Sequence, residues 1–215
     1  QKTGDDTSGD GSSDSPYRTI ARAMSQVQIG DTIVVDAGLF EERVIFERDL
    51  ITIVGKDSAG TVISGGLSAT GMDGIQIRDL AVTGAENGID LYSVNDGVVR
   101  NVHVYGNSGN GIRLRFSDDN LIADNLITDN ALAGILVIED SDSNVIVGNS
   151  FAGNATDVAT VELIVTGASQ NEKSSLSATK HSYRTVIWWN QSAGDNDWNE
   201  ISRHLRDRGV DFAAT

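Results

Sequence analysis

The sequence predicts an all-β fold, a single-stranded right-handed parallel β-helix (a solenoid of stacked short strands), from three regularities. Glycines recur at a spacing of 23 residues, at Gly88, Gly111 and Gly134. Each glycine precedes an apolar–polar–apolar run, and this alternation predicts a short strand with one buried face. Asparagines recur at similar intervals, at Asn107, Asn130 and Asn154. Strands this short are stable only when they stack in coils about 4.8 Å apart over a shared core.

The first 46 residues are expected to start the solenoid. Residues 1–14 are acidic and small, so their composition predicts a flexible N-terminal tail. Residues 15–27 form an amphipathic pattern with Pro16 in the first turn, which predicts a helix that caps the open end of the solenoid. Residues 31–46 then alternate like two strands. We expect the β-helix with its capping helix to span residues 15–166.

Two stretches near the N-terminus resemble the opening of pectin-lyase-like β-helix proteins. They are Ser-Pro-Tyr-Arg-Thr-Ile-Ala-Arg-Ala from Ser15, and Gly-Asp-Thr-Ile-Val-Val-Asp-Ala-Gly-Leu-Phe-Glu-Glu-Arg-Val from Gly30. The later coils, with Asn-Gly-Ile and Asn-x-Ile-x-x-Asn patterns, resemble the NosD-type repeats of the same superfamily. The resemblance covers roughly residues 15–166 and implies the fold. It implies no single function, because the superfamily holds lyases, epimerases, hydrolases, phage tailspikes, adhesins and non-enzymatic surface proteins.

The C-terminal part departs from the repeat. Residues 167–182 read as a linker, residues 183–189 as a last strand, and residues 198–208 as a helix that begins at a capping box and stops at Gly209. We expect residues 167–215 to form a strand–helix appendage that caps the solenoid. It holds all three tryptophans, Trp188, Trp189 and Trp198. The alternative is that these aromatic side chains dock a neighbouring subunit or a sugar ring.

The charge balance restricts the partners. The net charge is −15, and 23 Asp greatly outnumber 8 Glu. Such a surface repels itself unless salt screens it, so we interpret the chain as coming from a halophile, particularly a halophilic archaeon. An ordinary acidic secreted protein is the alternative. Nucleic acid is disfavoured because phosphate binding needs basic patches, and no run approaches the ~18 apolar residues that membrane insertion needs.

Outward positions of the predicted strands carry the candidate catalytic residues. Elimination on a polyuronide needs a base beside the sugar carboxylate and a cation that stabilises the enolate-like state. Four side chains of these types are Arg113, Arg115, Tyr92 and His103. Arg113 and Arg115 share a face with Tyr92, and His103 shares another with Tyr105, so either group could supply such a site. They match no specific lyase or epimerase signature. The alternative is a solvated strand face on which Asp90 pairs with Arg113 across coils.

We expect no metal or other cofactor. Asp140-Ser-Asp142-Ser-Asn144 resembles the start of a calcium loop, but the loop's glycine is missing and Phe151 stands at its twelfth position. Calcium there is the alternative to a plain turn. The resemblance to NosD-type repeats suggests a copper site, but the three histidines are far apart in the sequence, at His103, His181 and His204.

The predicted function is that of an extracellular structural protein on a cell or virion surface, for example a subunit of a virion spike or an extracellular filament. Self-association or binding to other surface proteins is the expected partnership. The alternative is a carbohydrate-active protein, either a lyase or epimerase on acidic polysaccharide or a glycan-binding module. The sequons at Asn154 and Asn190 suit a glycosylated, exported chain.

Overall fold

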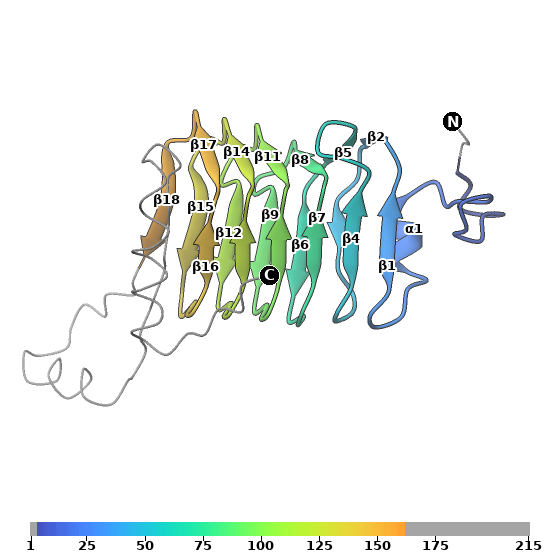
Figure 1. Cartoon of the computed structure of the whole chain (residues 1–215), viewed down its shortest axis with the longest axis horizontal. Coiled ribbons are helices and arrows are strands. Elements are labelled where there is room, and N and C mark those ends of the chain that lie inside the picture. The colour runs from blue at the N-terminus through green and yellow to red at the C-terminus, as the bar shows by residue number, and fades with distance from the viewer. Residues whose placement is uncertain (1–3, 162–215) are drawn as a thin grey trace, which may run out of the picture.

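The structure, a computed structural model, describes residues 4–161 and confirms the right-handed parallel β-solenoid. Three six-stranded parallel sheets form its three faces, and each coil contributes one strand to every sheet (Figure 1). The predicted appendage at 167–215, with its three tryptophans and Asn190, lies outside the described residues. No helix in the described part of the chain is long and apolar enough to cross a membrane.

The strands are three to six residues long, apart from the two-residue β3. Sheet A comprises β1 (Thr32–Val35), β4 (Thr52–Gly55), β7 (Gln76–Arg78), β10 (Val98–Arg100), β13 (Leu121–Ala123) and β16 (Val145–Val147). Sheet B comprises β2 (Gly38–Phe40), β5 (Thr61–Ser64), β8 (Ala81–Thr83), β11 (His103–Tyr105), β14 (Leu126–Thr128) and β17 (Ser150–Ala152). Sheet C comprises β3 (Val44–Ile45), β6 (Leu67–Thr70), β9 (Ile89–Tyr92), β12 (Ile112–Arg115), β15 (Ala133–Ile138) and β18 (Thr156–Val161).

The core is a column of stacked aliphatic side chains. Inward positions pair with their equivalents in the next coil, as Ile89, Ile112 and Ile135 do in sheet C, and all three are fully buried. Burying one such side chain is worth about 1.5–3 kcal/mol relative to leaving it exposed. The period-two alternation therefore fixes which side chains face outward and are free for function.

The 23-residue glycines are needed because successive backbones approach closely. A Cβ added at Gly111 would lie 2.5 Å from the carbonyl oxygen of Gly134, and one added at Gly134 would lie 2.7 Å from that of Asp157. Real Cβ atoms essentially never come so close to another heavy atom. Any side chain here would push the coils apart.

Asparagine rows satisfy the buried polar groups of the turns, as the sequence predicts for Asn107, Asn130 and Asn154. The Asn130 side-chain oxygen accepts from the backbone and side-chain N–H groups of Asn107 at 3.2 and 2.8 Å. The Asn130 side-chain amide donates to the Val104 carbonyl at 3.2 Å. Two further rows, Asn120–Asn144 and Asn125–Asn149, follow the same geometry. Because buried polar groups are costly when unpaired, these rows specify the coil register.

In the segment that precedes the first strand, carboxylate side chains accept hydrogen bonds from backbone N–H groups and hold the chain in place. Composition predicted flexibility for residues 1–14, whereas residues 4–14 form turns tied to the chain that follows. The Asp6 carboxylate accepts from the backbone N–H groups of Arg18 and Thr19 at 2.8 and 3.0 Å. Helix α1 (Ile20–Met24) then packs on the first coil, but it is shorter than the predicted 15–27, because Thr19 is its N-cap and Pro16 lies before it. Glu42 accepts from its first two N–H groups at 2.9 Å. Local hydrogen bonds therefore order a segment that has no apolar core of its own.

Candidate functional site

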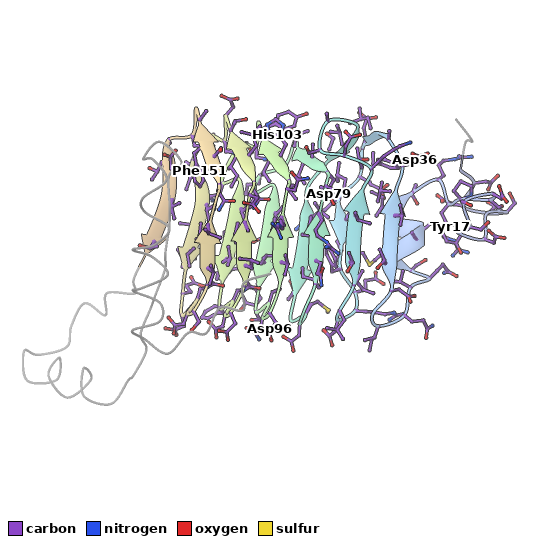
Figure 2. All side chains as sticks on the ribbon, in the orientation of Figure 1. Tyr17, Asp36, Asp79, Asp96, His103 and Phe151 are labelled. Atoms are coloured by element: carbon purple, nitrogen blue, oxygen red, sulfur yellow. The ribbon has the colours of Figure 1, made fainter. Side chains whose placement is uncertain are left out.

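The structure divides the predicted catalytic residues between two faces of the solenoid. Tyr92, Arg113 and Arg115 lie together on the outer face of sheet C, on the neighbouring strands β9 and β12. His103 lies on β11 of sheet B. In Figure 2, His103 is at the upper edge of the solenoid, while Asp96, in the turn after β9, is at the lower edge. A single site therefore does not combine all four residues.

The first contact on sheet C is an ion pair across coils. Arg113 pairs in register with Asp90 and donates two hydrogen bonds to its carboxylate, from Nε to Oδ1 at 2.8 Å and from Nη2 to Oδ2 at 2.7 Å. About a fifth of each side chain is exposed. The hydrogen bonds to Asp90 raise the pKa of Arg113. This confirms the cross-coil pairing of Asp90 and Arg113.

The second contact joins a guanidinium to two aromatic rings. Arg115 lies over the ring of Tyr92 at 4.4 Å, and Tyr92 meets the ring of Phe116 edge to face, with centroids 5.6 Å apart. The Arg115 Nε is 3.7 Å from the Glu139 carboxylate, which is an ion pair but too long for a hydrogen bond. We refer to these side chains together as the aromatic–arginine cluster, which comprises Asp90, Tyr92, Arg113, Arg115, Phe116 and Glu139.

Phe116, the last aromatic residue of the cluster, lies in the turn that follows β12. Its backbone conformation is unfavourable. Its φ is +51°, in the left-handed region that bulky side chains avoid. The equivalent positions in adjacent coils, Ser93 and Glu139, have the same conformation, so the turn imposes it on any residue placed there. The Phe116 side chain is 40% exposed. The conformation is therefore a property of the turn in each of these coils, and Phe116 differs from Ser93 and Glu139 in placing an aromatic ring there.

His103 stands in a smaller cluster on sheet B. Its ring stacks on Tyr105, with centroids 4.5 Å apart, and its Nε2 is 3.2 Å from the Thr128 hydroxyl. Partial burial lowers the pKa of His103, and the charge of Asp129 offsets part of this shift. The imidazole is therefore neutral near pH 7. The neighbours of His103 in the described residues are Tyr105, Thr128 and Asp129.

The predicted calcium loop is built into the solenoid. The Asn144 side-chain oxygen accepts from Asn120, and its amide donates to the Ser117 carbonyl at 2.8 Å. The Asp142 backbone N–H donates to the Asp118 carboxylate. Within residues 4–161, no three His, Cys, Asp or Glu side chains are grouped so as to hold a metal.

Asn154, the asparagine of the first predicted glycosylation sequon, belongs to the asparagine row that contains Asn130. Its side-chain amide nitrogen, the atom that would carry a glycan, donates to the Ile127 carbonyl at 2.8 Å. Its side-chain oxygen accepts from Asn130. We therefore expect Asn154 to be unmodified in the folded protein.

A family model described as "Periplasmic copper-binding protein (NosD)" matches residues 41–201. The chain belongs to the NosD family. The described part of this NosD chain does not fit copper, which binds imidazole, thioether and thiolate ligands. It contains one histidine, no cysteine and two methionines, of which Met24 is buried in the core and Met72 is partly buried against it.

Solved structures similar to the NosD chain include carbohydrate-active proteins. An alginate lyase from Paenibacillus sp. str. FPU-7 is 26% identical with a TM-score of 0.56, over 66% of this chain and 63% of that one. The catalytic domain of a GH87 α-1,3-glucanase in complex with tetrasaccharides is 22% identical with a TM-score of 0.63, over 70% and 31%. A Geobacillus virus E2 ORF18 protein is 14% identical with a TM-score of 0.53, over 66% and 37%. The NosD chain thus spans less than two thirds of each. A search of curated proteins finds no match.

Sequence reasoning missed two of the site residues, Phe116 and Glu139. Phe116 directly follows the strand that carries Arg113 and Arg115, where the previous coil has Ser93. An aromatic residue at a position occupied elsewhere by a turn-forming residue was the available signal.

Proposed function

We propose that this NosD-family β-helix is an extracellular glycan-binding protein that holds a polysaccharide chain on the outer face of sheet C. One observation carries the proposal: half-buried Tyr92 and exposed Phe116 form an edge-to-face aromatic pair on this face, and Arg115 stacks on the Tyr92 ring. Aromatic rings that are fixed and partly exposed supply flat apolar surface at a low entropic cost. The C–H face of a sugar ring matches such a surface.

The arrangement around the rings suits an extended ligand. Strand β12 places Arg113 two residues before Arg115 on the same face, and the Asp90–Arg113 pair lies beside the aromatic pair. This pair offers both acceptors and N–H donors to hydroxyl groups. The alginate lyase and the α-1,3-glucanase support the proposal as polysaccharide-active proteins of similar fold. The family's periplasmic description supports an exported location.

Binding to fluorescently labelled oligosaccharides, measured by anisotropy, tests the proposal. We expect Phe116→Ala and Tyr92→Ala each to weaken binding about tenfold or more. Leu126→Ala is the matched control, because Leu126 is 44% exposed, close to the 40% of Phe116, but lies on sheet B. If both aromatic variants bind as the unmodified protein does, sheet C is not the binding face.

A second candidate function is that of a self-assembling structural subunit of an extracellular filament or virion spike. Exposed apolar side chains near the first coil favour it. Exposed large apolar side chains gather within residues 29–50, namely Ile29 at 64%, Val34 at 76%, Leu39 at 62%, Ile45 at 55% and Leu50 at 52%. Light scattering and negative-stain microscopy in molar and low salt test this function. Ordered oligomers that are lost in a Val34→Thr and Leu39→Thr double variant would support it, and a strict monomer in molar salt would exclude it.

A further inference from the structure

We infer that the aromatic–arginine cluster takes a neutral hexose polymer and discriminates against polyuronides. The inference rests on the proposed function and narrows it to a substrate class. It follows from how the two guanidinium groups of the cluster are occupied.

Arg113 offers a sugar carboxylate only the N–H groups that Asp90 does not use, and a carboxylate bound there would lie beside that of Asp90. Both of its short hydrogen bonds go to Asp90, and both side chains of the pair are about four fifths buried. A uronate that displaced Asp90 would leave that carboxylate partly buried and unpaired, which is strongly unfavourable. A sugar hydroxyl has no such cost, because it can accept from Arg113 or donate to Asp90 while the pair stays intact.

Arg115 is occupied in a different way. One face of its guanidinium covers the Tyr92 ring, and the Glu139 carboxylate lies 3.7 Å from its Nε. Its charge is therefore already balanced across the coils. The guanidinium serves as a flat support for the aromatic pair, and an added carboxylate would meet Glu139 as well as Arg115.

The charges of the cluster and the net charge of the chain both disfavour the binding of a polyanion. Asp90 and Glu139 offset the two arginines, and Glu86 is close enough to add a third negative charge to the field at Arg113. The whole chain carries −15. Long-range repulsion slows the approach of a polyanion, and molar salt removes this effect, whereas salt does not free Arg113 from its hydrogen-bonded partner.

The experiment compares a labelled neutral glucan hexasaccharide with a labelled alginate hexasaccharide, by anisotropy at about 0.15 M and about 2 M salt. We expect alginate to bind at least about tenfold more weakly than the glucan, and to remain the weaker ligand in high salt. The double variant Asp90→Asn with Glu139→Gln frees both guanidinium groups at nearly constant shape. It should strengthen alginate binding about tenfold, so that the ratio of alginate affinity to glucan affinity rises.

A matched control separates local occupancy from net charge. Asp36→Asn with Asp57→Asn changes the net charge by the same amount, but both residues are exposed and lie in the first two coils, outside the cluster. It should leave the ligand preference unchanged. Alginate binding that equals or exceeds glucan binding, and that Phe116→Ala abolishes, would overturn the inference while leaving glycan binding at sheet C in place. Binding of neither ligand would overturn the proposed function itself.

Discussion

The strained backbone at Phe116 can be measured by comparing two substitutions that remove the same ring. Phe116→Ala and Phe116→Asn both lose the edge contact with Tyr92 and the partial burial of the ring. They differ in backbone cost, because Asn tolerates the left-handed conformation at φ +51° and Ala does not. The difference between the two variants therefore isolates the strain.

The magnitudes follow from the contacts. Holding a non-glycine residue in the left-handed region costs about 1–2 kcal/mol, and Asn recovers much of this. The lost aromatic pair is worth about 0.5–1.5 kcal/mol, to which partial burial adds a comparable amount. We expect Phe116→Asn to be about 1 kcal/mol more stable than Phe116→Ala, which corresponds to about 2–4 °C in Tm for a chain of this length.

Urea unfolding followed by circular dichroism gives the free energies, and oligosaccharide anisotropy gives the binding. Both variants should lose glycan binding to the same extent, so stability and binding separate. Ser93→Asn is the control, because Ser93 has the same conformation one coil earlier and lies outside the cluster. It should leave binding unchanged. A Phe116→Ala variant as stable as Phe116→Asn would refute the account of strain at this turn.

Four further outcomes are expected, each from one contact or charge. Gly111→Ala places a Cβ 2.5 Å from the Gly134 carbonyl oxygen and should lower the free energy of unfolding by about 2–3 kcal/mol in urea titration. Asn130→Ala leaves the two Asn107 donors and the Val104 carbonyl unpaired, which should cost about 2–4 kcal/mol by the same measurement. Because the folded-state pKa of His103 lies below its ordinary 6.5, the unfolded chain binds more protons just below that pH. Stability should therefore fall as pH drops from 7 toward 5, less steeply in His103→Gln, and parallel Tm–pH curves would contradict this. Raising salt to the molar range should increase Tm by screening a charge of −15, and a Tm that falls with salt would contradict the halophile interpretation.

The coil repeat could be predicted because two independent constraints mark it in the sequence. Gly111 is needed where backbones approach closely, and Asn130 is needed where a turn leaves buried backbone groups unpaired. Both recur once per coil, so spacing alone indicates the solenoid. The row through Asn125 was not recognised, because the preceding coils fill the equivalent position with Leu80 and Val102, whose buried side chains replace the hydrogen bonds by apolar packing.

The site was predicted only in part, for geometric reasons. Strand register follows from the repeat, so the pairing of Asp90 with Arg113 was accessible from the sequence. The separation of His103 from Arg113 was accessible as well, whereas the contact of Phe116 with Tyr92 was not, because Phe116 lies in a turn outside the strand alternation. Ordering of residues 4–14 was also missed, because it depends on individual carboxylate contacts such as that of Asp6, which composition does not report.

The rigidity of the coils explains how an outward strand face can present side chains in a fixed arrangement. Asparagine rows and glycine contacts fix each coil relative to the next, so side chains two residues apart on β9 and β12 meet their partners at set distances. Register thus pairs Asp90 with Arg113 and stacks Arg115 on Tyr92, and the turn then forces Phe116 outward. Because a fixed arrangement loses little entropy on binding, even a shallow face can hold a sugar chain. On this reasoning, loosening the coils at Gly111 should weaken glycan binding even though Gly111 touches no ligand, whereas removing Phe116 should weaken binding with the coils intact.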